Sequence, residues 1–433
     1  MKMKINSFIL ILVVSLLPPL LLGCGEENNL RTMGEWDSKP IENYQVTPIY
    51  GGAKISYTVP NEKGLLYVMA EYERNGKLFT EKSSIHSNEL VIEGFHNVDH
   101  VKATLYKVND REQKSKPLQI EFEPKESIIN IAQKSLKLLT SFGGIVGEWN
   151  NPMKTALGVR LMIPDSLDNK KFVTTEIFYS TDEAGRYPFR GLKPVLTTFA
   201  LLIEDKWGNS SDTIYFTTTP YFETMIPKPY ADFRASIPYD NASTLNEQAR
   251  FAFTNLWDNK VNQSAHGWLT NPGASGLSVT IDLKQRVKLS RMITHAYHIN
   301  SPFSGNVHPT TIEVWGTDKI DYDKLLDRPY WLDEWSVRRG YIKEVDVTTP
   351  MPERTFKDDW VYLGLHRTER PADKTLERQM AVTGFQYELP LDAGPVRYVR
   401  IFAREVDTSA PRADCYFAFG ELTFYGDNTI PQN

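Results

Sequence analysis

Cysteine is scarce in this chain of 433 residues, which contains only Cys24 and Cys415. Two cysteines do not make a disulfide framework, so the chain is not a disulfide scaffold. We expect Cys415, which directly precedes Tyr416 and Phe417, to be a buried and inert thiol. Positive charge is not in excess either, because 49 Lys and Arg face 54 Asp and Glu, for a net charge of -5. A mildly acidic chain lacks the basic surface that binds nucleic acid, and this class of partner is excluded.

The signature motifs of the common enzyme classes are missing too. The sequence has no Gly-x-Ser-x-Gly nucleophile elbow, no His-Glu-x-x-His zinc motif and no phosphate-binding loop. A pair of glycosidase carboxylates cannot be excluded in this way, because any two acids can meet in space. Small β-sandwiches, however, offer shallow loops rather than a deep pocket. We therefore expect a protein without enzymatic activity.

Long hydrophobic runs are absent except at the N-terminus. There, two lysines precede an apolar stretch over 8–22 that a Pro-Pro pair interrupts. The stretch is shorter than the ~20 residues needed to span a bilayer, so residues 1–23 are predicted to be a secretory signal peptide. It ends in Leu21-Leu22-Gly23-Cys24, which resembles the bacterial lipobox, in which the cysteine is acylated. The resemblance implies a lipid anchor on Cys24 and a polar tether over 24–35.

An acidic pair, Glu26 and Glu27, follows the lipobox closely. It resembles the export signal of surface lipoproteins in Bacteroidetes-type bacteria. This resemblance implies a lipid-anchored protein of the outer membrane that is exposed on the cell surface. A plain polar tether is the alternative interpretation of the same residues.

The rest of the chain is dominated by alternation of apolar and polar residues, which is typical of half-buried β-strands. Residues 53–59 alternate cleanly, as do 66–72, and Asn75-Gly76 then supplies a hairpin turn. The pattern predicts a β-sandwich over 36–123 that resembles a fibronectin type III module in size and strand spacing. A second sandwich is predicted over 124–220, although its first stretch, Ser127 to Leu139, fits either a short helix or a strand.

A proline-rich segment, 221–238, reads as a stiff linker or as a segment that covers a sheet edge. The third domain, 239–427, is about twice as large as the others and holds six of the nine tryptophans. Its strands again alternate, for example Val279, Ile281 and Leu283, and Val399, Ile401 and Ala403. The fold class expected for the whole chain is therefore all-β.

Six features of the third domain, in order, resemble the discoidin family, also called the factor V/VIII type C or galactose-binding-like family. They are Leu256-Trp257-Asp258 with Trp268, Val279–Leu283, Ile312–Asp318, Trp360–Gly364, Val396–Phe402 and Gly420–Gly426. The resemblance implies a jelly-roll β-sandwich after two fibronectin/immunoglobulin-like β-sandwiches. The whole arrangement resembles lipoproteins of Bacteroidetes polysaccharide-utilisation systems.

One departure from the discoidin pattern is an insertion over Lys319–Asp359. It is interpreted either as a scaffold or as a reshaping of the binding rim. Trp331 and Trp335 are four residues apart, so they would share one face of a helix, and packing onto the sheet is favoured over a ligand platform. Trp315 and Trp360 lie within predicted strands and are expected to belong to the core.

The resemblance to discoidin-like carbohydrate modules also implies a structural calcium ion beneath the binding loops. The matching positions are Asp258, Asn259, the carbonyl of Lys260, Ser264 and Glu421. Calcium takes six to eight oxygen ligands, which such groups can supply. The Asp-Gly-Asp of the family is Asp258-Asn259-Lys260 here, so one carboxylate is missing. A metal-free, hydrogen-bonded turn is the alternative.

A sugar site combines an aromatic face with planar polar side chains. The resemblance places it on the loops 265–272 and 295–308. The candidate ligand-binding residues there and on the preceding strand are His266, Trp268, Arg291, His295, Tyr297 and Asn300. For Trp268 a place in the core is the alternative.

Two functions are consistent with these features. The first is a non-catalytic surface lipoprotein that captures a polysaccharide or oligosaccharide through its C-terminal domain, with the two N-terminal sandwiches as a spacer. The second is a structural or docking lipoprotein that grips a partner outer-membrane protein and binds no sugar. A neighbouring outer-membrane glycan importer is a further expected partner.

Overall fold

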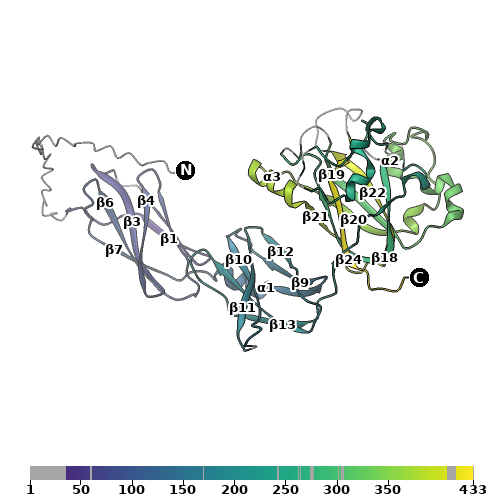
Figure 1. The fold of residues 1–433 in the computed structure, drawn as a ribbon. Helices are drawn as coiled ribbons and strands as arrows, with labels where there is room; N and C mark the ends of the chain where they lie inside the picture. Colours follow the sequence, from purple (N-terminus) through teal and green to yellow (C-terminus); the bar gives the residue numbers. More distant parts are fainter. Residues whose placement is uncertain are drawn as a thin grey trace, which may run out of the picture. The chain divides into compact units, whose positions relative to one another are not determined.

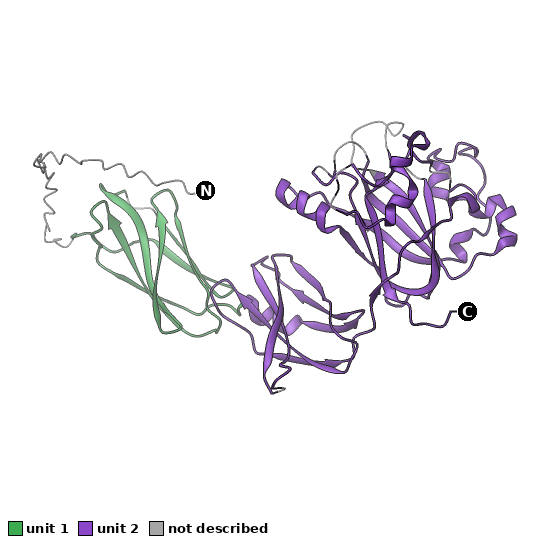
Figure 2. Ribbon diagram, viewed as in Figure 1, with its two compact units in different colours: residues 1–127 green, residues 128–433 purple. Residues whose placement is uncertain are grey.

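The computed structural model describes residues 36–58, 61–168, 170–240, 243–261, 263, 265–273, 277–300, 302–303, 307–406 and 416–432. It shows antiparallel sheets with a few short helices (Figure 1), so the all-β prediction is confirmed. The chain divides into two compact units, Met1–Ser127 and Ile128–Asn433 (Figure 2). Cys24, its leader and its tether lie outside the described residues, as do Ser264 and Cys415. No helix in the described ranges is long and apolar enough to cross a membrane.

The first unit is a sandwich of two sheets. One has the order β1-β2-β5 and the other β4-β3-β6-β7. The strands are β1 Tyr44–Ile49, β2 Gly52–Tyr57, β3 Leu65–Arg74, β4 Lys77–Ser84, β5 Glu89–Glu93, β6 Val101–Asn109 and β7 Leu118–Phe122. Alternate residues such as Ile55, Val68 and Leu105 point into a shared core. Asn75 and Gly76 join β3 to β4 with φ of 51° and 71°, the left-handed values of the predicted hairpin turn.

The second unit begins with another sandwich, whose sheets are β12-β9-β8 and β11-β10-β13-β14. Its elements are α1 Ile128–Ser135, β8 Lys137–Ser141, β9 Gly144–Asn150, β10 Leu157–Pro164, β11 Phe172–Ser180, β12 Ala184–Phe189, β13 Thr197–Asp205 and β14 Ile214–Thr218. The stretch 127–139, for which helix and strand were both open, is the helix α1 followed by β8. The helix buries Ile128, Ile129 and Ala132 against the core.

The remainder of the second unit, which we call the C-terminal domain, is a sandwich built around one long strand, β18. Its strands are β15 Thr224–Met225, β16 Ala231–Asp232, β17 Trp268–Leu269, β18 Ser278–His295, β19 Pro309–Thr317, β20 Val361–Arg367, β21 Phe385–Glu388, β22 Val396–Val406, β23 Ala418–Phe419 and β24 Glu421–Asp427. The first half of β18 pairs with β22 and β16, and its second half pairs with β24 and β21. A register shift after Asp282 separates the halves, so β18 contributes to both layers. The predicted sandwich is confirmed.

The proline-rich segment 221–238 belongs to this sandwich. Within it, β15 pairs with β24 and β16 pairs with β18. The segment therefore covers sheet edges, which is one of the two interpretations given above. Its Ile226 and Tyr230 side chains are part of the hydrophobic core.

The insertion packs against the outer face of β19 and β22. Its elements are α2 Glu334–Arg338 and the 3-10 turns Tyr322–Leu326, Arg328–Trp331 and Phe356–Asp358. The other short helices of the domain are α3 Lys374–Thr383 and the 3-10 turns Arg234–Ser236, Leu245–Glu247, Ala249–Phe251 and Phe253–Trp257. Strand β22 is buried on both faces: Val399 and Ile401 face the sandwich core, whereas Tyr398 and Phe402 face a second cluster. That cluster contains Tyr330, Trp331 and Phe356 of the insertion. Trp331 thus packs onto the sheet, as favoured, while Trp335 is half-buried between the guanidinium groups of Arg339 and Arg404.

Candidate functional site

Trp268, the aromatic residue expected to form the sugar platform, lies in the core. It is 0% exposed and makes edge-to-face contacts with Phe253 and Phe417, with ring centroids 4.8 and 5.2 Å apart. Its indole Nε1 donates a hydrogen bond to Thr244 Oγ1 at 3.3 Å. The cause is the pairing of β17 with β23, which turns the ring inward. The prediction that Trp268 forms a ligand platform was therefore wrong, and the alternative, that Trp268 belongs to the core, is confirmed.

Two further candidates, His295 and Tyr297, are also buried. A side chain at Gly384 would come within 3.0 Å of His295 Nε2, so the imidazole is closely covered. Burial, helped by the charge of Lys228, lowers the pKa of His295 to about 4. Tyr297 packs on Phe251 at a centroid distance of 6.3 Å. Neither ring is available to a sugar, because both complete the interior beneath the loops.

Arg291 lies on β18 and is held by an ion pair rather than open to a ligand. Its Nη2 is 3.2 Å from Glu223 Oε2, its Nη1 donates to Gln386 Oε1 at 2.8 Å, and its guanidinium stacks on the Tyr425 ring at 3.8 Å. Its position in β18 places Arg291 beside β21 and β24, away from the loops that hold the other candidates.

Three of the predicted sugar ligands keep some exposed surface. Asn300 is exposed, and Arg291 and His266 are half-buried, with His266 Nε2 2.8 Å from Asp258 Oδ2. The loops therefore do not bring the six candidates together as one aromatic-lined patch of described residues.

The positions expected to bind calcium are occupied by positive side chains. Asp258 Oδ2 is 3.0 Å from Lys260 Nζ and also contacts His266. Burial by itself raises the pKa of Asp258, but the hydrogen bonds from Lys260 and His266 bring it below its ordinary value. Glu421 is 0% exposed and its Oε1 forms an ion pair with Lys228 Nζ. In the described part of the chain no three His, Cys, Asp or Glu side chains are arranged to hold a metal ion. These residues do not fit a calcium ion.

The insertion instead forms a cavity of about 540 Å³. Ligand sites typically measure about 300–1,000 Å³. Its walls combine aromatic, charged and small polar side chains. They are Thr317, Lys319, Ile320, Asp321, Lys324, Tyr330, Trp331, Arg354, Asp359 and Trp360. We call this cavity the insertion pocket.

Local hydrogen bonds fix the walls of the insertion pocket. Trp331 Nε1 donates to the carbonyl oxygen of Lys324 at 2.7 Å, and the Tyr330 hydroxyl donates to Asp359 Oδ2 at 2.9 Å. Arg354 forms an ion pair with the other oxygen of Asp359. Tyr330, Trp331 and Trp360 pack edge to face, with centroid distances of 5.2 Å and 6.0 Å. The pocket is therefore formed before any ligand arrives.

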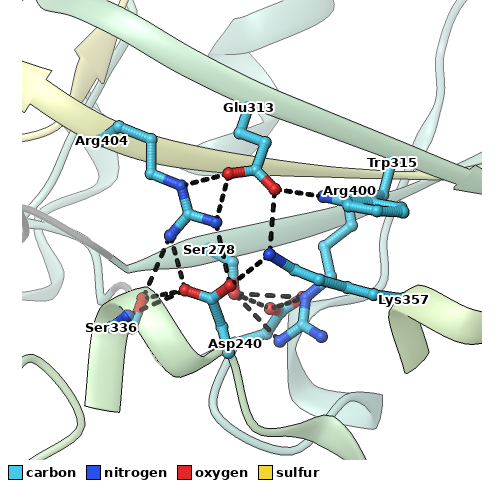
Figure 3. A network of polar contacts seen from close by, with 9 residues as sticks. Asp240, Ser278, Glu313, Trp315, Ser336, Lys357, Arg400 and Arg404 are labelled. Atoms are coloured by element: carbon cyan, nitrogen blue, oxygen red, sulfur yellow. Dashed lines mark hydrogen bonds and ion pairs between the residues drawn. The ribbon is translucent and has the colours of Figure 1, made fainter. Parts of the chain in front are cut away.

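A buried ion network lies under the insertion (Figure 3). Arg404 on β22 contacts Asp333 of the insertion at 2.6 Å and Glu313 of β19 at 2.6 Å. Lys357 bridges the same two carboxylates at 2.7 and 3.0 Å. Burial alone raises the pKa of Asp333, but Arg404 and Lys357 hold it well below its usual range. Beside this group, Arg400 pairs with Asp240 at 3.0 Å.

The chemistry of the insertion pocket favours binding over catalysis. A general acid needs a raised pKa, as in glycosidases. Burial pushes the pKa of Asp359 up, but its hydrogen bonds with Arg354 and Tyr330 bring it below the ordinary value. Asp359 is thus an ionised hydrogen-bond acceptor whose two oxygens are held in place by Tyr330 and Arg354. The sequence signal that could have located this site is the density of Trp, Tyr, Asp and Arg in an insertion.

Three family models match parts of the chain, and each is described as a domain of unknown function. They are DUF4959 over residues 38–124, DUF5126 over 125–229 and DUF5000 over 257–426. No curated protein matches the sequence.

Among solved structures, the chain is similar to a SusE-like protein at 17% identity, over 68% of this chain and 97% of that chain, with a TM-score of 0.35. It is similar to CBM32-3 from a family 31 glycoside hydrolase of Clostridium perfringens at 14% identity, over 45% and 96% of the two chains, with a TM-score of 0.26. A segment of two fibronectin type III domains from chicken tenascin is 12% identical, over 41% and 98%, with a TM-score of 0.20.

Proposed function

We propose that this protein is a non-catalytic glycan-binding lipoprotein of the outer-membrane surface, and that the insertion pocket is its binding site. The observation that carries the proposal is a cavity of about 540 Å³ whose lining combines the accessible charged groups of Arg354 and Asp359 with largely buried aromatic rings. Polysaccharides and oligosaccharides present many hydroxyl groups, which pair with carboxylates and guanidinium groups such as those of Asp359 and Arg354. Because these side chains are already held in place, little ordering entropy is lost on binding.

The lipid anchor belongs to the same proposal. Acylation of Cys24 would hold many copies on one membrane, so weak single sites would act together on one polymer. A neighbouring outer-membrane importer would then receive the captured glycan. Metabolic labelling with a fatty acid tests the anchor. Cys24→Ser is expected to abolish labelling and to release the protein from the membrane fraction.

Affinity electrophoresis tests the binding site. The chain from Gly25 onward is run through gels that contain a panel of polysaccharides, alongside the variants Arg354→Ala, His266→Ala and Asn300→Ala. Arg354→Ala is expected to lose the retardation, at least tenfold in affinity, because a charged hydrogen-bond partner is removed from the pocket. The two loop variants are expected to bind as the parent does, and circular dichroism checks that each variant is folded. Retardation lost in His266→Ala but kept in Arg354→Ala would place the site on the loops instead.

Docking to a partner outer-membrane protein, without sugar binding, is the second candidate. The burial of Trp268, His295 and Tyr297 favours it, because aromatic side chains that complete the interior leave a loop surface suited to protein contact. If no glycan in the panel retards the protein, and a partner co-purifies with it from crosslinked outer membranes, docking replaces glycan binding as the proposed function.

A further inference from the structure

The edge-covering segment carries a lysine into the C-terminal domain. Lys228 lies between β15 and β16, and its side chain is only 7% exposed. Its ammonium group contacts Glu421 Oε1 and donates a hydrogen bond to Thr423 Oγ1 at 3.0 Å. Glu421 is the first residue of β24 and is 0% exposed. A lysine is rarely buried to this extent unless it is paired.

The neighbouring turn also points its polar groups at Glu421. The backbone N–H of Asn259 donates to Glu421 Oε1 at 3.2 Å, and Asn259 has a φ of 64°, which lets the chain turn there. Glu421 Oε2 has no hydrogen-bond partner within the described ranges. One open oxygen falls far short of the six to eight that calcium takes.

We propose that the ammonium group of Lys228 takes the place of the calcium ion that the discoidin resemblance implies, so that this domain folds and works without calcium. The positive charge of Lys228 lies on β24, against Glu421 and Thr423, while the loop reaches the same carboxylate through the backbone N–H of Asn259. That charge is covalently part of the chain rather than taken up from solution.

The balance of charges around the site is complete without a metal. Two carboxylates, Asp258 and Glu421, face two ammonium groups, Lys260 and Lys228. Lys260 stands where the family pattern has its second aspartate, so that position supplies a cation instead of a ligand. A dication brought to this site would meet two positive charges and one unpaired oxygen, which opposes its binding.

The ion pair also attaches the edge-covering segment to the domain. Because Lys228 precedes β16 and follows β15, its bond to β24 fixes the backbone between the two edge strands. A calcium ion would make no such side-chain bond to the segment, which would then be held by the pairing of β15 and β16. The Lys228–Glu421 ion pair therefore adds a side-chain attachment between the edge-covering segment and β24.

The first test uses the chain from Gly25 onward, with thermal unfolding measured in EDTA and in millimolar calcium. We expect the two melting temperatures to agree within about 1 °C and calorimetric titration to show no heat of binding. A resident calcium ion at saturating concentration would raise the melting temperature by about 5 °C or more. Such a rise, or a measurable binding heat, would overturn the proposal.

The second test removes the lysine. Lys228→Ser opens the site and leaves Glu421 unpaired, so we expect the melting temperature to fall by about 10 °C in EDTA and to recover partly in calcium. Lys343→Ala is the matched control, since that lysine of the same domain is exposed and lies outside the site, so its loss is expected to change the melting temperature little. A Lys228→Ser variant that folds but gains nothing from calcium would show that Lys228 does not stand in the ion's position.

A third variant keeps the proposal testable if Lys228→Ser fails to fold. The pair Lys228→Met and Glu421→Gln removes both charges at similar volume. We expect it to fold with a melting temperature near that of the parent and to be unaffected by calcium, because a buried ion pair can be replaced by neutral groups at little cost. A calcium-dependent melting temperature in this double variant would contradict the proposal. These measurements do not depend on the glycan panel, so either result leaves the proposed function to its own test.

Discussion

The two sides of the C-terminal domain use aromatic side chains in different ways. At the strand-end loops, Trp268 and Tyr297 are absorbed into the hydrophobic core and leave no platform on the described surface. On the side of the insertion, Tyr330 and Trp360 are packed just as firmly but line the insertion pocket. The difference lies in what supports them. The loops rest on an apolar core, whereas the insertion rests on a second aromatic cluster with a buried ion network beside it.

This contrast shows that aromatic content does not by itself locate a binding site. What makes a site is a concave surface whose polar groups are fixed by neighbours. The insertion provides this through the ion pair between Arg354 and Asp359 and the hydrogen bond from Tyr330.

The largest expected effect comes from truncating the core aromatic on the loop side. Trp268→Ala should lower the free energy of unfolding by about 4 kcal/mol, because it removes a fully buried ring. Trp335→Ala, which loses a half-buried tryptophan on the insertion side, should cost about 1 kcal/mol. Urea unfolding followed by tryptophan fluorescence and circular dichroism measures both. Equal losses of unfolding free energy in the two variants would contradict the difference between the loop side and the insertion side.

A somewhat smaller loss is expected from breaking the ion network under the insertion. Asp333→Asn leaves Arg404 and Lys357 without one of their carboxylate partners, which should cost about 3 kcal/mol. The control is Asp168→Asn, because the pair of Asp168 with Lys171 is largely exposed and should contribute less than about 0.5 kcal/mol. Unfolding midpoints in urea compare the two. Similar small shifts in both would mean that the network does not support the pocket.

Acid sensitivity should come from the loop side. Burial lowers the pKa of His308 from 6.5 to about 3, so the folded domain keeps this imidazole neutral while the unfolded chain protonates it. The stability that depends on neutral His308 is present above pH 6.5 and is lost as the pH falls toward 3. At pH 5 the loss should reach about 2 kcal/mol. His308→Leu should reduce this loss when urea midpoints at pH 7.5 and pH 5 are compared, and an unchanged difference would argue against the assignment.

The smallest effect on stability is expected in the pocket wall. Tyr330→Phe removes one hydrogen bond to Asp359 and should cost about 1 kcal/mol or less. The same change should weaken glycan retardation several-fold, because Asp359 loses one of the two groups that hold it. A variant that binds as well as the parent would show that the position of Asp359 does not matter for the ligand.

The sequence predicted the strands well where the alternating pattern was long. Residues 53–57 of the first alternating stretch lie in β2 and residues 66–72 lie in β3. The alternation in Val399, Ile401 and Ala403 correctly gave the inner face of β22. Strand β17 has only two residues, Trp268 and Leu269, which is too short for the pattern to show which way its side chains point.

The Lys228–Glu421 pair could not be predicted because its two residues meet only through the tertiary fold. Lys228 and Glu421 are 193 residues apart in sequence, so no local spacing links them. The insertion folds mainly as 3-10 turns, which have no apolar period to read. Its tryptophans could be assigned to the sheet but not to a cavity, since the ion network beneath the insertion joins residues from three separate segments.

The alternation along β22 has a consequence for folding. Its outward positions include Arg400 and Arg404, and its inward positions include Val399 and Ile401. A slip of one residue against β18 or β19 would carry both guanidinium groups into the apolar interior and set aliphatic side chains against carboxylates. Mispaired strands are thus heavily penalised, and the charges that support the pocket also select the correct alignment of the central sheet.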